Sequence, residues 1–207
     1  DMYEYSAMIA RIRDLDERKH QLPILTELRI KLADLMTHNT IEFIEDVLEE
    51  SEGKLMVFTS FLAPMHAIHA AYPDNSLAYH GEMTDRQKED TKRRFRTDDN
   101  IKVLVSTIRS SGLCLNFPEA DKVIFNDVEW TPADCFQAED RTWRMGQKRA
   151  VNIYYLGFKE TYQEVMFDII NRKAKVVAAV LDGDPINEER DILSAIIESI
   201  KGWHVEM

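Results

Sequence analysis

Two arginines in the second half of the chain, Arg141 and Arg144, carry the clearest chemical signal in the sequence. They stand three positions apart in a stretch with helical character, and side chains at that spacing lie on one side of a helix. A guanidinium group is always charged and forks onto phosphate oxygens, which suits the charge that develops on a transferred phosphoryl group. The alternative is that they are surface arginines that form ion pairs with Glu139 and Asp140. These residues alone do not decide between the two interpretations.

The charge of the chain is unevenly distributed. The 207 residues include 26 basic and 37 acidic side chains, a net charge of −11, which argues weakly against nucleic-acid binding. Residues 1–53 and 181–207 hold all of the excess acid, with balances of −7 and −5, whereas 54–180 have a balance of +1. Within this centre, residues 86–96 hold six basic and two acidic side chains, a cluster that can attract phosphate or simply form a solvated helix face.

Several classes of protein are excluded by composition. The two cysteines, Cys114 and Cys135, form no CxxC pair and indicate no disulfide framework, which favours a reducing intracellular setting. No apolar run approaches the roughly 20 residues that span a membrane, and the start shows no signal-peptide pattern. His66 and His69 lack a third ligand at a metal spacing, so no metal site is expected. Because no initiator methionine comes first, we expect a piece of a longer protein.

The elements that must position the two arginines alternate between strands and helices. Short apolar runs rich in β-branched and aromatic residues suit parallel strands buried on both faces: 55–58, 103–105, 123–125, 153–156 and, more weakly, 76–79. Helices are predicted between them over 63–72, 84–96 and 132–142, with Thr84 as an N-cap and Pro132 in a first turn. This alternation predicts an α/β fold with a wound parallel sheet.

Both ends of the chain are predicted to be helical. The first 50 or so residues contain two helical stretches that Pro23 separates, and Thr40 is a plausible N-cap within the second half. Helical patterns return over about 161–181 and 187–201. We therefore expect three parts, which are a helical extension at 1–53, an α/β lobe at 54–160 and terminal helices at 161–207.

Five stretches of the centre follow the order and spacing of a known family. Residues 137–147, Gln-Ala-Glu-Asp-Arg-Thr-Trp-Arg-Met-Gly-Gln, resemble the sixth helicase motif of Swi/Snf-type DNA translocases in helicase superfamily two. Residues 54–60 resemble the fourth motif of the family, and residues 79–95 resemble the strand–loop–helix that follows it. Residues 103–116 resemble the fifth motif, and residues 123–132 resemble the strand and turn before the arginine motif. The tail from residue 161 is similar to the brace helix of the family, so the resemblance covers about 54–181. Within the family, the sequence is most similar to the annealing-helicase branch.

The resemblance implies a RecA-like parallel sheet flanked by helices, with a helical N-terminal extension and C-terminal brace helices. Arg141 and Arg144 match arginine-finger positions, and Arg144 is the stronger candidate for the γ-phosphate. Gln137 and Gly112 are expected on the nucleotide side. ATP and Mg²⁺ would be bound mainly by an N-terminal lobe of the same protein, because this sequence contains neither a phosphate-binding GxxxxGK[ST] loop nor an Asp-Glu-x-His motif.

Six further positions are expected on the DNA-phosphate side of the lobe, and they are Ser60, His80, Gly81, Arg86, Ser106 and Thr107. Hydroxyls and backbone N–H groups at strand ends can hydrogen-bond a phosphate oxygen without reading the base. Ser60 and Thr107 can also do no more than cap their own strands. The fifth motif departs from the commonest family form, because Ser111-Gly112 and Cys114 stand where many members have glycines.

The implied function is that of the C-terminal motor lobe of an ATP-dependent double-stranded DNA translocase or annealing helicase. Such an enzyme would be intracellular, nuclear in a eukaryote or cytoplasmic in a prokaryote or virus host, with no membrane partner and no implied oligomer. The isolated chain is expected to hydrolyse no ATP. An RNA helicase lobe is the nearest rival, and the Trp-x-Pro turn at 130–132 favours the DNA enzymes. A non-catalytic nucleic-acid-binding module is a third reading, which Arg141 and Arg144 disfavour.

Overall fold

The structure, a computed structural model, describes residues 7–11, 18–49, 53–111, 117–129, 132–139, 150–159, 161–168 and 170. The chain forms two compact units, which are described separately. The larger one, the sheet unit, comprises residues 33–129 and 133–156. The smaller one comprises residues 1–32, 130–132 and 157–207.

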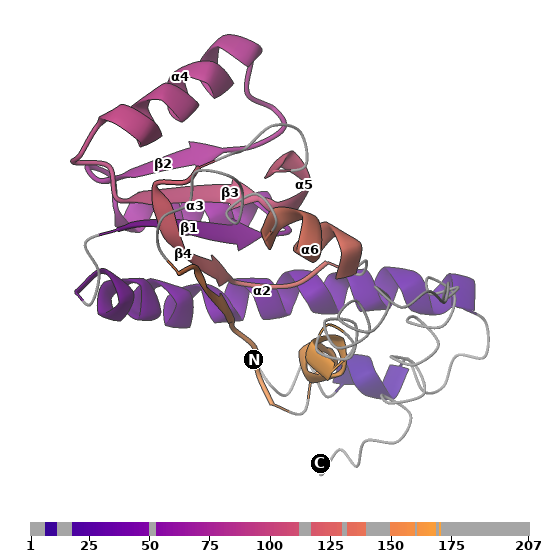
Figure 1. The fold of residues 1–207 in the computed structure, drawn as a ribbon. Coiled ribbons are helices and arrows are strands. Elements are labelled where there is room, and N and C mark those ends of the chain that lie inside the picture. The colour runs from indigo at the N-terminus through magenta and orange to yellow at the C-terminus, as the bar shows by residue number, and fades with distance from the viewer. Residues whose placement is uncertain are drawn as a thin grey trace, which may run out of the picture. The chain divides into compact units, whose positions relative to one another are not determined.

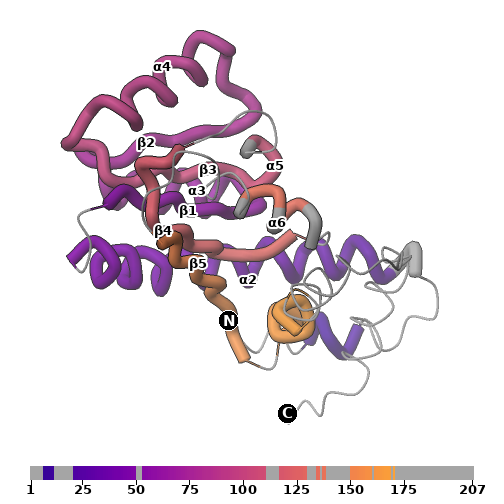
Figure 2. The backbone as a smooth tube through the Cα atoms, viewed as in Figure 1, coloured from indigo at the N-terminus to yellow at the C-terminus, as the bar shows by residue number. Residues whose placement is uncertain are grey.

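The sheet unit is built on five parallel strands (Figures 1 and 2). In chain order they are β1 (Lys54–Thr59), β2 (Ser76–Tyr79), β3 (Val103–Thr107), β4 (Ala120–Phe125) and β5 (Asn152–Tyr155), and in space they follow the order β2-β3-β1-β4-β5. The central strands β1 and β3 are buried along their whole length, which requires nearly continuous apolar sequence. The parallel sheet and its five strands, predicted from those apolar runs, are confirmed.

The register of the strands aligns their carboxyl ends. Thr59 and Thr107, the last residues of β1 and β3, are paired with each other. Phe125 at the end of β4 pairs with Phe58 of β1 and with Tyr155, the last residue of β5. β2 ends opposite the penultimate residue of β3. Residues that directly follow the strands therefore meet along one edge of the sheet, however far apart they are in the sequence.

Helices connect the strands, and they are α3 (Leu62–Ala71), α4 (Asp85–Thr97), α5 (Ile108–Ser111) and α6 (Pro132–Glu139). A capping box opens α4, in which the Thr84 hydroxyl accepts from the Gln87 N–H at 3.3 Å and the Gln87 side chain accepts from the Thr84 N–H at 2.8 Å. The predicted N-cap is thus confirmed, and the helices predicted over 63–72 and 84–96 are correct to within one residue. No sequence pattern predicted the four residues of α5.

One apolar cluster packs α2 (Arg18–Glu49) and α3 against the sheet. Its fully buried members are Ile44 and Val47 from α2, Met65 and Ile68 from α3, and Leu55, Val57, Val103, Val105 and Ile124 from the strands. Because successive side chains of a strand point to opposite faces, Met56 and Phe58 lie on the other face, where the Phe58 ring is 5.2 Å from that of Phe125. The carboxyl-terminal part of α2 therefore shares a core with the strands.

Helix α2 differs from the sequence prediction in two ways. The separation of two helical stretches at Pro23 is wrong, because α2 continues from Arg18 to Glu49 with Pro23 inside it. Pro23 lies in the second turn of the helix, where its missing N–H removes one intrahelical hydrogen bond without ending the helix. Thr40 is not an N-cap, because it is fully buried within α2 and its hydroxyl donates to Asn126 Oδ1 at 2.6 Å.

In the smaller unit, residues 162–168 and 170 are helical, as predicted from residue 161 onward. Tyr162, Met166 and Ile170 are buried there. The rest of that helix and the predicted helix at 187–201 lie outside the described residues, and the division of the chain at 53 and 160 stays a prediction. Among the described helices, none combines the length and the apolar character that a membrane crossing needs.

Candidate functional site

The carboxyl edge of the sheet gathers the predicted phosphate-side residues that the structure describes. Ser60 follows β1, His80 and Gly81 follow β2, and Thr107 ends β3. In open parallel sheets, ligands bind outside the carboxyl ends of the strands. The structure therefore places residues from three separate motifs at one edge, the position at which such folds bind their ligands.

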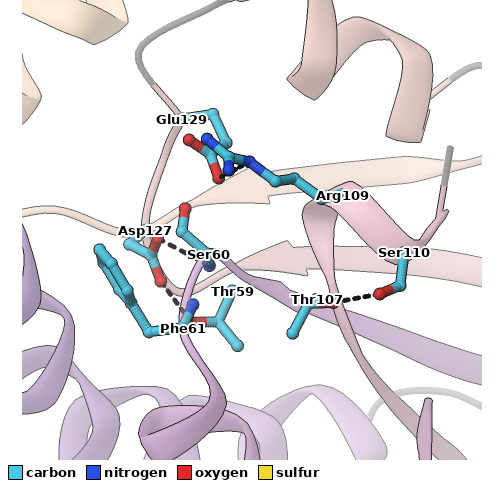
Figure 3. A network of polar contacts seen from close by, with 8 residues as sticks. All are labelled: Thr59, Ser60, Phe61, Thr107, Arg109, Ser110, Asp127 and Glu129. Atoms are coloured by element: carbon cyan, nitrogen blue, oxygen red, sulfur yellow. Dashed lines mark hydrogen bonds and ion pairs between the residues drawn. The ribbon is translucent and has the colours of Figure 1, made fainter. Parts of the chain in front are cut away.

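Asp127 organises the centre of this edge, although the sequence analysis gave it no role (Figure 3). It follows β4 and is fully buried, and its carboxylate accepts hydrogen bonds from Thr59 Oγ1 at 2.5 Å and from the Ser60 N–H at 2.9 Å. A third bond, at 3.2 Å, comes from Nδ2 of its neighbour Asn126. Burying a carboxylate is costly unless donors surround it, and here three donors do so. Its place two residues after a buried strand was the sequence signal that could have identified it.

Asn126 extends the same network to α2. Its Oδ1 accepts from the Thr40 hydroxyl at 2.6 Å, and its Nδ2 donates to the backbone oxygen of Ala33 at 3.1 Å. Asn126 and Thr40 are both fully buried. A continuous set of hydrogen bonds thus joins α2, the end of β4 and the end of β1 in the interior of the sheet unit.

The end of β3 carries a second hydroxyl pair. The Thr107 hydroxyl donates to Ser110 Oγ of α5 at 2.6 Å, and Thr107 is only 8% exposed. Ser106 is fully buried and its hydroxyl bonds to the backbone oxygen of Thr107 at 3.2 Å. Of the two predicted residues on β3, Ser106 therefore does not reach the surface in this structure, because its side chain points into the sheet unit. Ser110 is the more accessible hydroxyl of this loop.

The loop after β2 lies next to α5. A Cβ placed on Gly81 would be 3.6 Å from Ser110 Oγ, and the Gly81 oxygen accepts from Lys88 Nζ at 3.2 Å. The ring of His80 contacts that of His66 with their centroids 5.6 Å apart. Nδ1 of His80 is buried and has no hydrogen-bond partner within the described part of the chain. Gly81 itself is exposed, so its backbone is open to a ligand.

Helix α4 presents a cationic surface beside this loop. The predicted residue Arg86 is exposed and lines a shallow groove along the helix with Arg93, Arg96 and Asp90. A hydrogen bond from Arg93 at 2.6 Å lowers the pKa of the Asp90 carboxyl, and the charges of the neighbouring arginines add to this effect. The acidic side chain in the groove is therefore held ionised by its cationic surroundings.

An ion pair that the sequence analysis missed crosses the edge from α5 to the segment after β4. Arg109 Nε lies 3.4 Å from Glu129 Oε1, and the Glu129 side chain is 4% exposed whereas that of Arg109 is 77% exposed (Figure 3). Nothing in the sequence pairs two residues twenty positions apart, because their proximity depends on the order of β3, β1 and β4 in the sheet.

The nucleotide-side residues are described only in part. Gln137 lies on α6 and is exposed. Gly112, Arg141 and Arg144 lie outside the described residues, so their expected roles stay predictions. Among the residues that are described, no group of three or more His, Cys, Asp and Glu side chains can hold a metal ion.

Comparison with known proteins shows which family the chain belongs to. The sequence model described as "Helicase conserved C-terminal domain" matches residues 39–146, which is more than half of the chain and includes β1 to β4. The chain belongs to the helicase C-terminal domain family. This confirms the helicase family that the arginine motif and its neighbours indicated.

The relatives of this helicase domain include annealing helicases. It is 31% identical over 145 residues to human "DNA annealing helicase and endonuclease ZRANB3", which covers 69% of this chain and 13% of that protein. It is 28% identical over 150 residues to the Xenopus tropicalis "SWI/SNF-related matrix-associated actin-dependent regulator of chromatin subfamily A-like protein 1", covering 71% of this chain and 16% of the relative. The helicase domain thus corresponds to less than a fifth of the length of either relative.

Solved structures agree with the fold. The Sulfolobus solfataricus "SWI2/SNF2 ATPase core in complex with dsDNA" superposes with a TM-score of 0.69 at 20% identity, covering 98% of this chain and 47% of that one. The "C-terminal part of Fun30 ATPase domain" gives a TM-score of 0.62 at 18% identity over 79% of this chain and 51% of the other. The predicted RecA-like sheet with flanking helices is therefore confirmed.

Proposed function

We propose that this helicase domain is the C-terminal motor lobe of an ATP-dependent double-stranded DNA translocase or annealing helicase. Its partner within the same protein would be an N-terminal lobe that makes most of the contacts with ATP and Mg²⁺. When bound, Mg²⁺ neutralises charge on the β- and γ-phosphate oxygens. The contribution of this lobe is then the pair Arg141 and Arg144, with Gln137 and Gly112 on the nucleotide side.

The observation that carries the proposal is the agreement between the family match and the carboxyl edge of the sheet. The family match covers Arg141 and Arg144, the two residues whose guanidinium groups suit a transferred phosphoryl group. The edge brings together small hydroxyls, an exposed glycine backbone and an adjacent cationic helix, all of which suit contact with a phosphate backbone. Because these groups can bind phosphates without reading bases, they fit an enzyme that moves along DNA of any sequence.

DNA contact is proposed for Ser60, His80, Gly81, Arg86 and Thr107. Ser60, Gly81 and Arg86 offer the more accessible groups. Thr107 would act through Ser110, whose hydroxyl oxygen accepts a hydrogen bond from the Thr107 hydroxyl. Cycles of ATP binding and hydrolysis would open and close this lobe against its partner. Each closure would move the phosphate contacts of this lobe along the DNA. In a protein of this class the DNA would also stimulate ATP hydrolysis.

The test uses the full-length protein and measures ATP hydrolysis with and without duplex DNA. Arg144→Ala is expected to lower the DNA-stimulated rate about a thousand-fold or more, as loss of an arginine finger does in other phosphoryl-transfer enzymes. Arg11→Ala, which removes an exposed arginine of the smaller unit, is the matched control and should leave the rate unchanged. An Arg141→Ala, Arg144→Ala double variant with the wild-type rate would refute the proposal.

Two further measurements separate the proposal from its rivals. Duplex DNA should stimulate hydrolysis more than RNA of the same length, and the reverse order would favour an RNA helicase. The isolated 207-residue chain should show no ATP turnover, since the phosphate-binding loop and the metal-binding motif are not in its sequence. Measurable turnover by this chain alone would contradict the shared ATP site.

A further inference from the structure

The segments that follow β2 and β3 meet at the carboxyl edge of the sheet. The two strands are neighbours, and Tyr79 at the end of β2 pairs with Ser106 of β3. As a result, a Cβ placed on Gly81 would be only 3.6 Å from the Oγ atom of Ser110 in α5. The glycine and the serine therefore face each other closely, although they belong to separate motifs.

The hydroxyl of Ser110 can still donate a hydrogen bond. Its oxygen accepts from the Thr107 hydroxyl at 2.6 Å (Figure 3), so its own hydrogen has to find a different acceptor. Ser110 makes no other hydrogen bond to any residue that the structure describes. A hydroxyl that accepts a hydrogen bond becomes a better donor, because bonds in such a chain polarise one another. Thr107 is only 8% exposed whereas Ser110 is half-buried, so a ligand would contact Ser110.

The turn that contains Gly81 carries further donors. The Met83 N–H donates to the His80 oxygen at 3.3 Å, which closes a four-residue turn with Gly81 and Glu82 at its centre. The N–H groups of these two central residues donate to no acceptor in the described part of the chain. Lys88 Nζ donates to the Gly81 oxygen at 3.2 Å, and its positive charge offsets the charge of Glu82. Because the unused groups here are hydroxyl and N–H donors, they suit a ligand that accepts hydrogen bonds, such as a phosphate.

Neither the backbone nor the packing of the fold requires glycine at position 81. The φ angle of Gly81 lies outside the left-handed region that favours glycine, and its Cβ would meet Ser110 Oγ at an ordinary van der Waals distance. At Gly157, by contrast, a Cβ would collide with the ring of Phe167. A side chain at position 81 would instead change access to the edge, since it would stand directly beside the Ser110 hydroxyl.

We propose that the Ser110 hydroxyl donates a hydrogen bond to a DNA phosphate, and that Gly81 keeps the approach to this hydroxyl open. This deepens the proposed function and rests on it, because it takes the phosphate to be that of DNA. Thr107 acts behind Ser110 as a positioning residue, through the hydrogen bond that orients the Ser110 hydroxyl. The competing account is that this bond only holds α5 against the end of β3.

A double-mutant cycle on the full-length protein distinguishes these accounts. The variants are Ser110→Ala, Gly81→Ala and the two combined, and the main readout is the dissociation constant for a short duplex. Loss of one hydrogen bond to a charged group corresponds to roughly a tenfold weaker dissociation constant, which is expected for each single variant. The double variant should bind about as weakly as Ser110→Ala alone, because the approach that the new methyl group blocks then leads to no hydroxyl.

Two further readouts separate a ligand contact from a structural role. Gly81→Ala should melt at the wild-type temperature or above, since alanine restricts the unfolded chain without straining the fold. Ser110→Ala should leave the slope of log affinity against log salt unchanged, because a neutral hydroxyl displaces no counterion. Thr107→Val removes the donor to Ser110 at nearly constant volume, and its effect on affinity should disappear when Ser110 is already alanine.

The control is Thr26→Ala, which removes an exposed hydroxyl from the part of α2 that belongs to the smaller unit. This hydroxyl bonds only to the backbone oxygen of Leu22, one turn earlier in the same helix. The variant should therefore bind the duplex with the wild-type dissociation constant.

Each outcome bears on the proposal. Wild-type affinity in Ser110→Ala would overturn it, since the contact would not exist. Losses that multiply fully in the double variant would remove the role of Gly81, as would a Gly81→Ala protein that melts well below the wild type. All three results leave the proposed function intact. A full-length protein that neither binds duplex DNA nor hydrolyses ATP would instead refute the proposed function, and this proposal with it.

Discussion

Lys54, the first residue of β1, allows one prediction to be worked out in detail. It is 8% exposed, and its Nζ donates to the backbone oxygens of Phe95 at 2.5 Å and Asp98 at 2.8 Å, at the carboxyl end of α4. The ammonium group also lies 5.2 Å from the centre of the Phe95 ring. Carbonyls at the end of a helix lack partners within the helix, and a cation there also interacts favourably with the helix dipole.

Substitution of Lys54 by Met should lower the free energy of unfolding by about 2–4 kcal/mol. Each hydrogen bond to a charged group contributes about 1.5–3 kcal/mol, and the unfavourable burial of the ammonium group offsets part of the sum. Methionine keeps most of the volume, so the loss of polar contacts dominates. Urea unfolding at pH 7, followed by circular dichroism, measures the change.

The pH dependence gives an independent check on the same residue. Burial lowers the pKa of Lys54 from its ordinary value of 10.5, although the charge of Asp99 raises it in part. Between the lowered pKa and 10.5 the unfolded chain binds more protons than the folded protein, so this group makes stability rise with pH over that range. Lys54→Met lacks this component, so the difference in stability between wild type and variant should grow as the pH approaches 10.5.

The control is Lys122→Met, which removes a half-buried lysine of β4 near the same end of the sheet. It should change the free energy of unfolding by less than about 0.5 kcal/mol. A Lys54→Met protein as stable as wild type would refute the reasoning, because desolvation of the ammonium group would then cancel both hydrogen bonds.

Three further predictions concern a helix cap, a buried tyrosine and the DNA surface. Thr84→Ala removes the capping box of α4 and should lower the free energy of unfolding by about 1 kcal/mol, measured by urea unfolding, with Thr84→Ser as a variant that retains it. Burial, with a smaller contribution from Glu45, raises the pKa of Tyr72 to about 12, so its stabilising effect is complete below pH 10 and is lost as the pH rises toward 12. Ultraviolet titration of wild type against Tyr72→Phe should find this late-titrating phenol, and an ordinary pKa near 10 would contradict the burial. Arg86→Ala in the full-length protein should flatten the dependence of log affinity on log salt by about one, and an unchanged slope would exclude Arg86 from the phosphate contacts.

Local patterns accounted for most of the elements. The runs at 55–58 and 103–105 predicted β1 and β3 because a strand buried on both faces needs apolar residues at every position. Thr84 predicted the start of α4 because its cap is formed by residues three positions away. Pro23 misled the prediction for α2, since tertiary contacts, which no local pattern records, hold the helix together despite the hydrogen bond that the proline removes.

The sequence by itself determined the family, through an arginine motif and four further stretches in a set order, and it determined the wound parallel sheet. The resemblance to the family also brought Ser60, His80 and Thr107 into consideration, because they match its phosphate-side positions. Only the tertiary structure assigned roles to Asp127 and Lys54. Thr59, a partner of Asp127, and Phe95, a partner of Lys54, lie more than forty positions away from them in the chain. The strand order that brings such residues together is set by packing of the whole sheet, which no local pattern records.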